Sequence, residues 1–213
     1  MNVRMQIEDD IAILNVDIQP DFCPGGKLGV SEGDLVVPVM NEINELGRTT
    51  DSLVVFTKDW HPEVTTHFAK YGGAWPEHCV QGTSGAELHP DLVVKVEDVI
   101  VAKGMGAAED AYSGFEARTE KGEMLQEVLE TRGVKRLIVG GLATDYCIRW
   151  SVLDALKNGF EVYVIDEGVR AVNIKPDDGK QAWEEMVKAG AKRISLEEAK
   201  QLLTRGINQG SAR

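Results

Sequence analysis

Ile11-Ala-Ile-Leu-Asn-Val16 is followed directly by Asp17, and this short stretch decides the fold class. Its nearly continuous apolar character is typical of a strand that is buried on both faces of a parallel sheet. Similar apolar runs return at residues 53–56, 98–102, 136–140 and 161–165, with a weaker sixth run at residues 191–194. The sequence therefore predicts a six-stranded, mainly parallel sheet.

Amphipathic stretches separate these apolar runs, with helical spacing at residues 35–46, 123–130, 148–156, 181–188 and 196–203. The alternation of strands and helices favours right-handed βαβ crossovers and a three-layer α/β/α sandwich. No internal repeat or linker divides the chain, so we expect residues 1–213 to form a single domain. The exception to the alternation is residues 59–97, and a loop of that length inside a compact domain usually carries a function.

The overall charge excludes several kinds of partner. The 23 basic and 35 acidic side chains give a formal net charge of −12, which repels nucleic acids and anionic lipid surfaces. No apolar run approaches the roughly 20 residues of a membrane-spanning helix, and residues 1–10 carry charges where a signal peptide has an apolar core. We therefore expect a cytoplasmic protein that binds a small molecule, with neither nucleic acid nor membrane as a partner; a homo-oligomer is left open.

Three of the four histidines, His61, His67 and His78, lie close together in the long loop, just after Asp59. Asp59 and His61 are two residues apart, so their side chains share one face of an extended segment, and a folded loop can bring the other two histidines to the same point. Imidazole and carboxylate ligands suit one divalent metal ion, with zinc as first candidate and iron or manganese as alternatives. The competing interpretation is a polar surface loop whose histidines only form hydrogen bonds.

A cysteine follows the fourth predicted strand, in Gly140-Gly-Leu-Ala-Thr-Asp-Tyr-Cys147. This segment leaves a buried strand and enters a predicted helix, which places the sulfur near a helix N-terminus. The helix dipole and the free backbone N–H groups there favour a thiolate, and the same N–H groups can receive an oxyanion. A buried cysteine at such a place is also common as a simple packing residue.

Asp17 and Lys103 each follow an apolar strand directly, where burial of a charge without a partner is costly. A lysine ammonium beside Cys147 would stabilise the thiolate, and a carboxylate could accept the thiol proton and pass it to a leaving amine. In open parallel sheets ligands bind beyond the carboxyl ends of the strands, so these residues are candidates for a site. The competing interpretation is a structural ion pair at the end of the sheet.

Together these motifs resemble the isochorismatase-like cysteine hydrolase superfamily, from residue 11 to about residue 170, and within it the nicotinamidase branch. The Asp, Lys and Cys elements are shared across the superfamily, whereas the set of Asp59, His61 and His78 is characteristic of the nicotinamidase branch. The matching segments are Asp17-Ile-Gln-Pro-Asp-Phe22, Lys58-Asp-Trp-His61, Trp75-Pro-Glu-His-Cys79, Lys103-Gly104 with Tyr112-Ser-Gly-Phe115, and Gly141-Leu-Ala-Thr-Asp-Tyr-Cys147.

The resemblance implies an amidohydrolase that converts nicotinamide to nicotinate and ammonia. In this family Asp17 would be the general base and acid, Lys103 the electrostatic support, and Cys147 the nucleophile that forms a thioester. The backbone N–H groups of Ala143 and Cys147 would form the oxyanion hole, with a cis peptide bond between Leu142 and Ala143.

The resemblance also implies a substrate pocket and a use for the metal ion. Phe22, Trp75 and Tyr112 match positions that line the pyridine pocket of the family, with ordinary aromatic core as the competing interpretation. His67 matches a fourth metal ligand that only some family members have. The metal ion would anchor the pyridine nitrogen of the substrate.

Other functions stay open at this point. One is a metal-free member of the superfamily that acts on an N-carbamoyl or ureido compound or on isochorismate. Another is a non-enzymatic metal-binding or thiol-redox module, which leaves Asp17 and Lys103 unexplained, and a third is an isochorismatase-like partner domain without activity. Cys23, Cys79 and His89 match no catalytic position, and we expect them to be structural, with all cysteines present as thiols.

Overall fold

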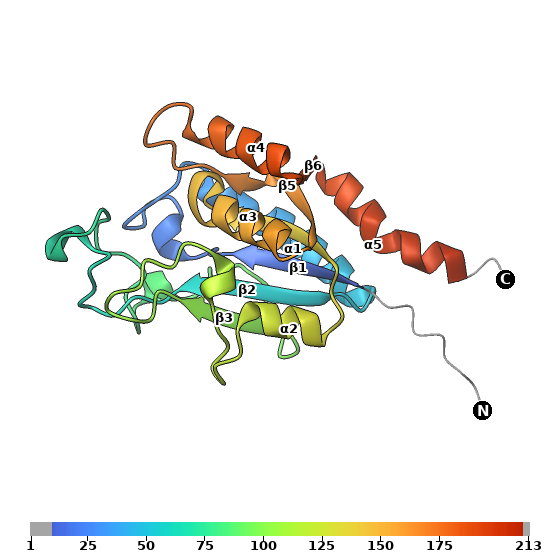
Figure 1. The fold of residues 1–213 in the computed structure, drawn as a ribbon, viewed down its shortest axis with the longest axis horizontal. Helices are drawn as coiled ribbons and strands as arrows, with labels where there is room; N and C mark the ends of the chain where they lie inside the picture. The colour runs from blue at the N-terminus through green and yellow to red at the C-terminus, as the bar shows by residue number, and fades with distance from the viewer. Residues whose placement is uncertain (1–9, 211–213) are drawn as a thin grey trace.

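The computed structural model describes residues 10–210, which contain one six-stranded sheet (Figure 1). All paired strands run parallel, in the order β3-β2-β1-β4-β5-β6, which confirms the predicted sheet. The prediction that the chain begins without a signal peptide rested on residues 1–10, and residues 1–9 lie outside the described residues. The strands are β1 (Ile11–Val16), β2 (Leu53–Asp59), β3 (Val99–Lys103), β4 (Arg136–Leu142), β5 (Glu161–Arg170) and β6 (Lys192–Ile194).

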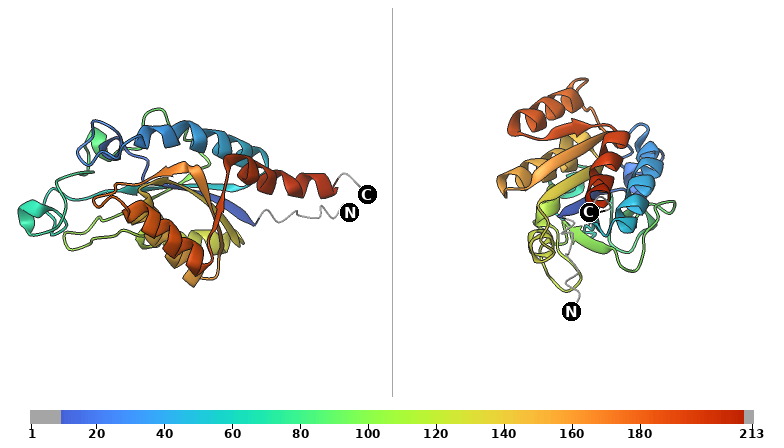
Figure 2. Two further views of the ribbon diagram at one scale, coloured as in Figure 1. Left: turned by 90° about the horizontal axis from the view of Figure 1, so that it is seen from above. Right: turned by 90° about the vertical axis from the view of Figure 1, so that its right-hand side faces the viewer.

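Five α-helices cover the two faces of this sheet, as the amphipathic stretches predicted. They are α1 (Val36–Thr49), α2 (Leu125–Thr131), α3 (Arg149–Lys157), α4 (Asp178–Ala189) and α5 (Leu196–Gly210). Figure 2 shows α1 and α5 on one side of the sheet and α3 and α4 on the other. Two separate apolar cores result, one beneath α1 and α5 and one beneath α2, α3 and α4, which confirms the three-layer sandwich.

The order of the strands creates a switch point between β1 and β4. From β1 the chain builds outward through β2 and β3, and it then returns to the other side of β1 to add β4, β5 and β6. A side chain at Gly141 would place its Cβ 2.0 Å from the Val16 carbonyl oxygen, so only glycine lets the end of β4 approach β1 this closely. The loops gather beyond the carboxyl ends of the strands, at the left of Figure 1, where ligands bind in open parallel sheets.

The long loop after β2 has only short 3₁₀ turns, at Ala69–Tyr71 and Ser84–Ala86. It folds back on itself, because the His61 N–H donates to the Cys79 carbonyl at 2.9 Å and the Gln81 N–H donates to the His61 carbonyl at 2.8 Å. This pairing brings His61 close to His78. Within residues 10–210, no helix combines the length and apolarity needed to cross a membrane.

Candidate active site

The three residues predicted to carry the chemistry lie together at the carboxyl ends of three strands. Asp17 follows β1 directly, Lys103 ends β3, and Cys147 lies in the turn after β4. The Lys103 Nζ is 2.8 Å from Asp17 Oδ2 and 3.5 Å from Cys147 Sγ, and it also forms an ion pair with Asp59. All of these side chains are buried, so their mutual charges act in an environment with little water.

Asp17 is held in place by β2, its neighbour in the sheet. Its backbone has a φ of 49°, and its N–H donates to the Thr57 carbonyl at 3.2 Å. The Thr57 hydroxyl donates to Asp17 Oδ1 at 2.5 Å, which leaves Oδ2 facing Lys103. Thr57 was not predicted from the sequence as a site residue. It precedes Asp59 by two residues, so the two side chains point to the same side of β2.

The backbone before and around Cys147 has an unusual conformation. The peptide bond between Leu142 and Ala143 is cis, as the resemblance implied, and one π-helical turn, Thr144–Ile148, precedes α3. The Ala143 carbonyl accepts hydrogen bonds from the N–H groups of Tyr146 and Ile148, at 3.0 and 3.1 Å. The helix start was predicted, the π turn was not, and the use of the Ala143 and Cys147 N–H groups as an oxyanion hole stays a prediction.

The pKa of the Cys147 thiol differs from the expectation from the sequence. Burial raises the pKa of the Cys147 thiol well above its usual value; Lys103 opposes this, and the charges of Asp17 and Asp59 add to it. The expectation of a favoured thiolate is therefore wrong for the free protein, because the loss of hydration outweighs the attraction of the lysine. Burial likewise raises the pKa of Asp17, against the opposing effect of Lys103. A carboxyl group with a raised pKa is a stronger base, which suits it to remove the thiol proton.

Lys103 remains charged despite its complete burial. Burial acts to lower the pKa of Lys103, but Asp17 and Asp59 outweigh it and raise the pKa well above its usual value. Burial also acts to raise the pKa of Asp59, yet Lys103 and the imidazoles of His61 and His78 hold it below the usual range. Lys103 and Asp59 therefore form a permanent ion pair beside the neutral thiol.

The predicted metal ligands converge beside this ion pair. His61, His67 and His78 each offer a ring nitrogen within 4.8 Å of the other two. Asp59 Oδ2 lies 3.5 Å from His61 Nε2 and 4.0 Å from His78 Nε2, while its other oxygen faces Lys103. One carboxylate thus joins the histidine cluster to Lys103, which contacts the Cys147 sulfur.

The histidine rings are oriented as metal-binding imidazoles usually are. Their Nδ1 atoms lie 3.1 Å from the Gly104 carbonyl for His61, 3.0 Å from an Asp110 carboxylate oxygen for His67, and 2.7 Å from the Pro76 carbonyl for His78. An Nδ1–H that donates to such an oxygen fixes the tautomer and leaves the Nε2 lone pair free for a metal ion.

The protonation and hydrogen bonding of the three histidines suit a divalent ion. The His61 Nε2 atom is buried and has no hydrogen-bond partner in the described residues, which is costly unless a ligand satisfies it. Burial lowers the pKa of His67, and it lowers the pKa of His78 to about 4, so both imidazoles are neutral near pH 7. Neutral imidazoles and one carboxylate suit zinc and also suit iron and manganese.

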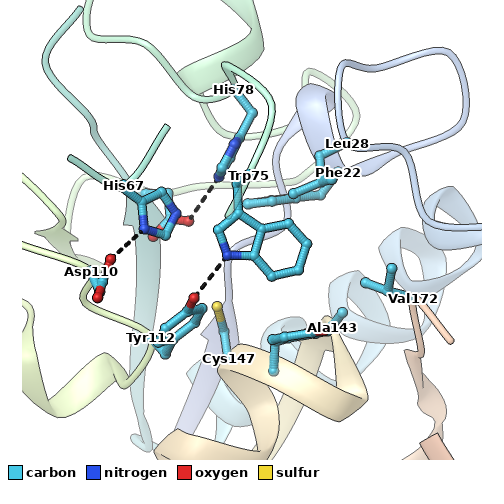
Figure 3. Close-up of a pocket in the computed structure, with 12 residues that line it drawn as sticks. Phe22, Leu28, His67, Trp75, His78, Asp110, Tyr112, Ala143, Cys147 and Val172 are labelled. Carbon is cyan, nitrogen blue, oxygen red and sulfur yellow. Dashed lines mark hydrogen bonds and ion pairs between the residues drawn. The ribbon is translucent and has the colours of Figure 1, made fainter. Parts of the chain in front are cut away.

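A cavity connects the histidine cluster to Cys147 (Figure 3). The Trp75 Nε1–H donates to the Tyr112 hydroxyl at 2.8 Å, and the Trp75 ring meets Tyr146 edge to face at 4.8 Å. Phe22, Trp75 and Tyr112 all lie in the wall, where the resemblance placed the ring pocket. Four lining residues were not predicted from the sequence: Leu28, Asp110, Tyr146 and Val172. Tyr146 precedes Cys147 directly, and Val172 follows β5.

Comparison with known proteins agrees with this geometry. The chain is 41% identical to a nicotinamidase of Escherichia coli, over 87% of this chain and 94% of that one, and 38% identical to a nicotinamidase/pyrazinamidase of Mycobacterium tuberculosis, over 82% and 93%. A solved pyrazinamidase of Pyrococcus horikoshii in complex with zinc has a TM-score of 0.80 at 43% identity, covering 87% of this chain and 99% of that one. Residues 11–198 match the isochorismatase domain, and the chain therefore belongs to the isochorismatase family.

Proposed function

We propose that this chain is a nicotinamidase, an amidohydrolase that converts nicotinamide to nicotinate and ammonia. One observation carries the proposal: Asp59 contacts the lysine of a buried Asp-Lys-Cys set with one oxygen and faces two histidines with the other. The nucleophile and a set of metal ligands therefore face the same cavity. The nicotinamidases among the relatives support this assignment.

The cavity suits a flat aromatic amide. Phe22, Trp75 and Tyr112 present aromatic surface to it, and the Cys147 sulfur lies at its inner end (Figure 3). Aromatic side chains bind a planar ring through stacked and edge-to-face contacts. The Trp75–Tyr112 hydrogen bond fixes the tryptophan ring, and an aromatic amide bound against it would share the cavity with the Cys147 sulfur.

The chemistry follows from the positions of Asp17, Lys103 and Cys147. As the sulfur bonds to the amide carbon, Asp17 accepts the thiol proton and Lys103 stabilises the negative charge that develops on sulfur. The carbon–nitrogen bond then breaks, and Asp17 delivers its proton to the departing nitrogen, which leaves as ammonia. Water next attacks the thioester carbon while Asp17 accepts a proton from it; return of that proton to the sulfur frees nicotinate and the thiol.

His61, His67, His78 and Asp59 would hold one divalent ion, for which we propose zinc first, with iron or manganese as alternatives. Bound there, the ion supplies a Lewis acid that takes the pyridine nitrogen and anchors the ring. The ion is not needed to generate a hydroxide nucleophile, because Cys147 already supplies the nucleophile.

Ammonia release from nicotinamide by the purified, zinc-loaded protein is the direct test. The Cys147→Ala variant is the matched control, since it removes the nucleophile and leaves the metal ligands in place. Metal analysis of the same sample separates the proposal from a metal-free amidohydrolase that acts on an N-carbamoyl or ureido compound. Absence of ammonia release by a zinc-loaded, folded protein would contradict the proposal.

Three further expectations from the sequence remain predictions. These are the cytoplasmic location, the single domain over residues 1–213, and the absence of nucleic acid and membrane partners. Whether the protein forms a homo-oligomer stays open.

A further inference from the structure

Two polar side chains of the Asp17–Phe22 segment have no role in the chemistry described above. Gln19 and Asp21 are 0% and 6% exposed, although buried polar groups are costly unless they are hydrogen-bonded. They lie on either side of Pro20, with Gln19 two residues after Asp17 and Asp21 directly before Phe22. Their partners are on a different part of the chain, the long loop that carries the histidines.

The Gln19 side chain forms hydrogen bonds with the backbone at the start of this loop. Its side-chain oxygen accepts a hydrogen bond from the Asp59 N–H at 2.8 Å, and its side-chain NH₂ donates to the Asp59 carbonyl at 2.8 Å. The same NH₂ donates to the Ala86 carbonyl at 2.7 Å. One amide thus meets both backbone groups of Asp59, as a neighbouring strand would, and ties them to a later part of the loop.

Asp21 binds the backbone in the middle of the loop in a similar way. Its Oδ2 accepts a hydrogen bond from the Cys79 N–H at 2.7 Å, next to His78. Cys79 has a φ of 45°, which a residue with a side chain adopts only when its surroundings enforce it. The Cys79 carbonyl in turn accepts from the His61 N–H at 2.9 Å.

The Asp21 carboxylate is also closely packed. A Cβ at Gly85 would lie 2.3 Å from Asp21 Oδ1, so the glycine backbone rests directly on the carboxylate. This contact keeps the carboxylate aimed at the Cys79 N–H.

We propose that Gln19 and Asp21 are positioning residues for the metal site: Gln19 fixes Asp59, and Asp21 fixes Cys79 and through it His61 and His78. This inference rests on the metal assignment in the proposed function. The ligands are spread from Asp59 to His78 along a loop that has almost no regular structure, so the loop by itself does not hold them at metal-binding distance. The segment after β1 supplies the missing rigidity, because it is anchored to the sheet.

The test is the zinc affinity of the metal-free, full-length protein, measured by competition with a chromophoric chelator. Gln19→Met and Asp21→Leu keep the approximate size of each side chain and remove its hydrogen bonds. We expect each to weaken zinc binding by about 10- to 100-fold, the usual effect of losing a group that orients metal ligands. Asp21→Asn keeps an acceptor for the Cys79 N–H and should retain most of the affinity.

A buried amide outside the site provides the structural control. Asn44 of α1 is fully buried and exchanges hydrogen bonds with Asn15 of β1, at 2.9 and 3.0 Å. Asn44→Leu should lower the melting temperature but change zinc affinity by less than about twofold, because distant sites act independently. The d–d absorption spectrum of the cobalt-loaded protein gives a second readout, which should change in Gln19→Met and stay unchanged in Asn44→Leu.

Several results would overturn the inference. It fails if Gln19→Met and Asp21→Leu bind zinc as tightly as the unmodified protein, or if Asn44→Leu loses as much affinity as they do. If Gln19→Met does not fold, as judged by near-UV circular dichroism, the comparison of Asp21→Leu with Asp21→Asn decides. Failure of the unmodified protein to bind zinc, iron or manganese would refute the metal assignment itself, whereas tight binding unaffected by these variants would refute only the positioning role.

Discussion

Replacing Lys103 by methionine tests whether its charge drives the chemistry. Methionine is similar in length and removes only the ammonium group, which sits 3.5 Å from the Cys147 sulfur and 2.8 Å from Asp17 Oδ2. The variant therefore exposes the developing thiolate to two carboxylates, Asp17 and Asp59, without the cation between them. We expect slower hydrolysis of nicotinamide and a thiol that is harder to ionise.

The size of the effect follows from the geometry. Two unit charges 3.5 Å apart attract by about 5 kcal/mol at an effective dielectric constant of about 20. Loss of this attraction raises the pKa of the Cys147 thiol further, because the lost charge favoured the thiolate. Relaxation of the site and entry of water reduce the figure, so we expect kcat/KM to fall by at least about 10².

Two assays measure this prediction, ammonia release under steady-state conditions and the rate of thiol alkylation against pH. Lys58→Met is the matched control, since Lys58 lies in the neighbouring strand β2, one residue before Asp59, but pairs with the exposed Glu87 at 3.4 Å. Near-UV circular dichroism checks that each variant is folded, because removing one partner of a buried ion pair costs about 3–5 kcal/mol of stability. If Lys103→Met is folded and its activity and alkylation profile match those of Lys58→Met, Lys103 does not support the thiolate.

Three other predictions concern the remaining parts of the site. Cys147→Ala should abolish turnover while leaving the fold and the metal content unchanged, and Cys147→Ser should be very slow because an alcohol is much harder to ionise; appreciable steady-state hydrolysis by Cys147→Ala would exclude the covalent mechanism. Asp17→Asn should lower kcat by about 10² or more, since an amide cannot accept the thiol proton, and near-normal single-turnover rates would contradict a role as base. Nicotinamide should be hydrolysed up to roughly 10⁴ times faster than benzamide, because benzamide lacks the ring nitrogen. His61→Ala or chelation of the metal should remove most of this preference. Equal rates for the two amides in the intact enzyme would refute the anchoring role of the metal.

The sequence predicted the strands and helices well because their patterns are local. Six apolar runs became six parallel strands, and five amphipathic stretches became the helices. The ends were less accurate: β5 continues to Arg170, beyond the predicted end at residue 165, where Asp166, Glu167 and Gly168 interrupt the apolar run. These polar residues lie at a register shift in the pairing with β4, which resumes at Val169 and Arg170, and no local pattern records that pairing.

The candidate site was predicted unevenly, for a related reason. Asp17, Lys103, Cys147 and the histidines were found because their residue types are costly or reactive at those places. Thr57 and Asp110 were missed, because a threonine in a strand and an exposed aspartate are ordinary until their partners, Asp17 and His67, are known.

The sequence by itself therefore determined the order of the secondary structure, the identity of the reactive groups and the grouping of the histidines on one loop. Only the tertiary structure decided the protonation of Cys147 and the bridging position of Asp59, which lies 44 residues before Lys103 in the chain and yet forms an ion pair with it. It also decided the contacts of Gln19 with Asp59 and of Asp21 with Cys79, which span 40 and 58 residues. Burial and charge–charge energies depend on distances between groups far apart in sequence, and those distances exist only once the sheet has assembled.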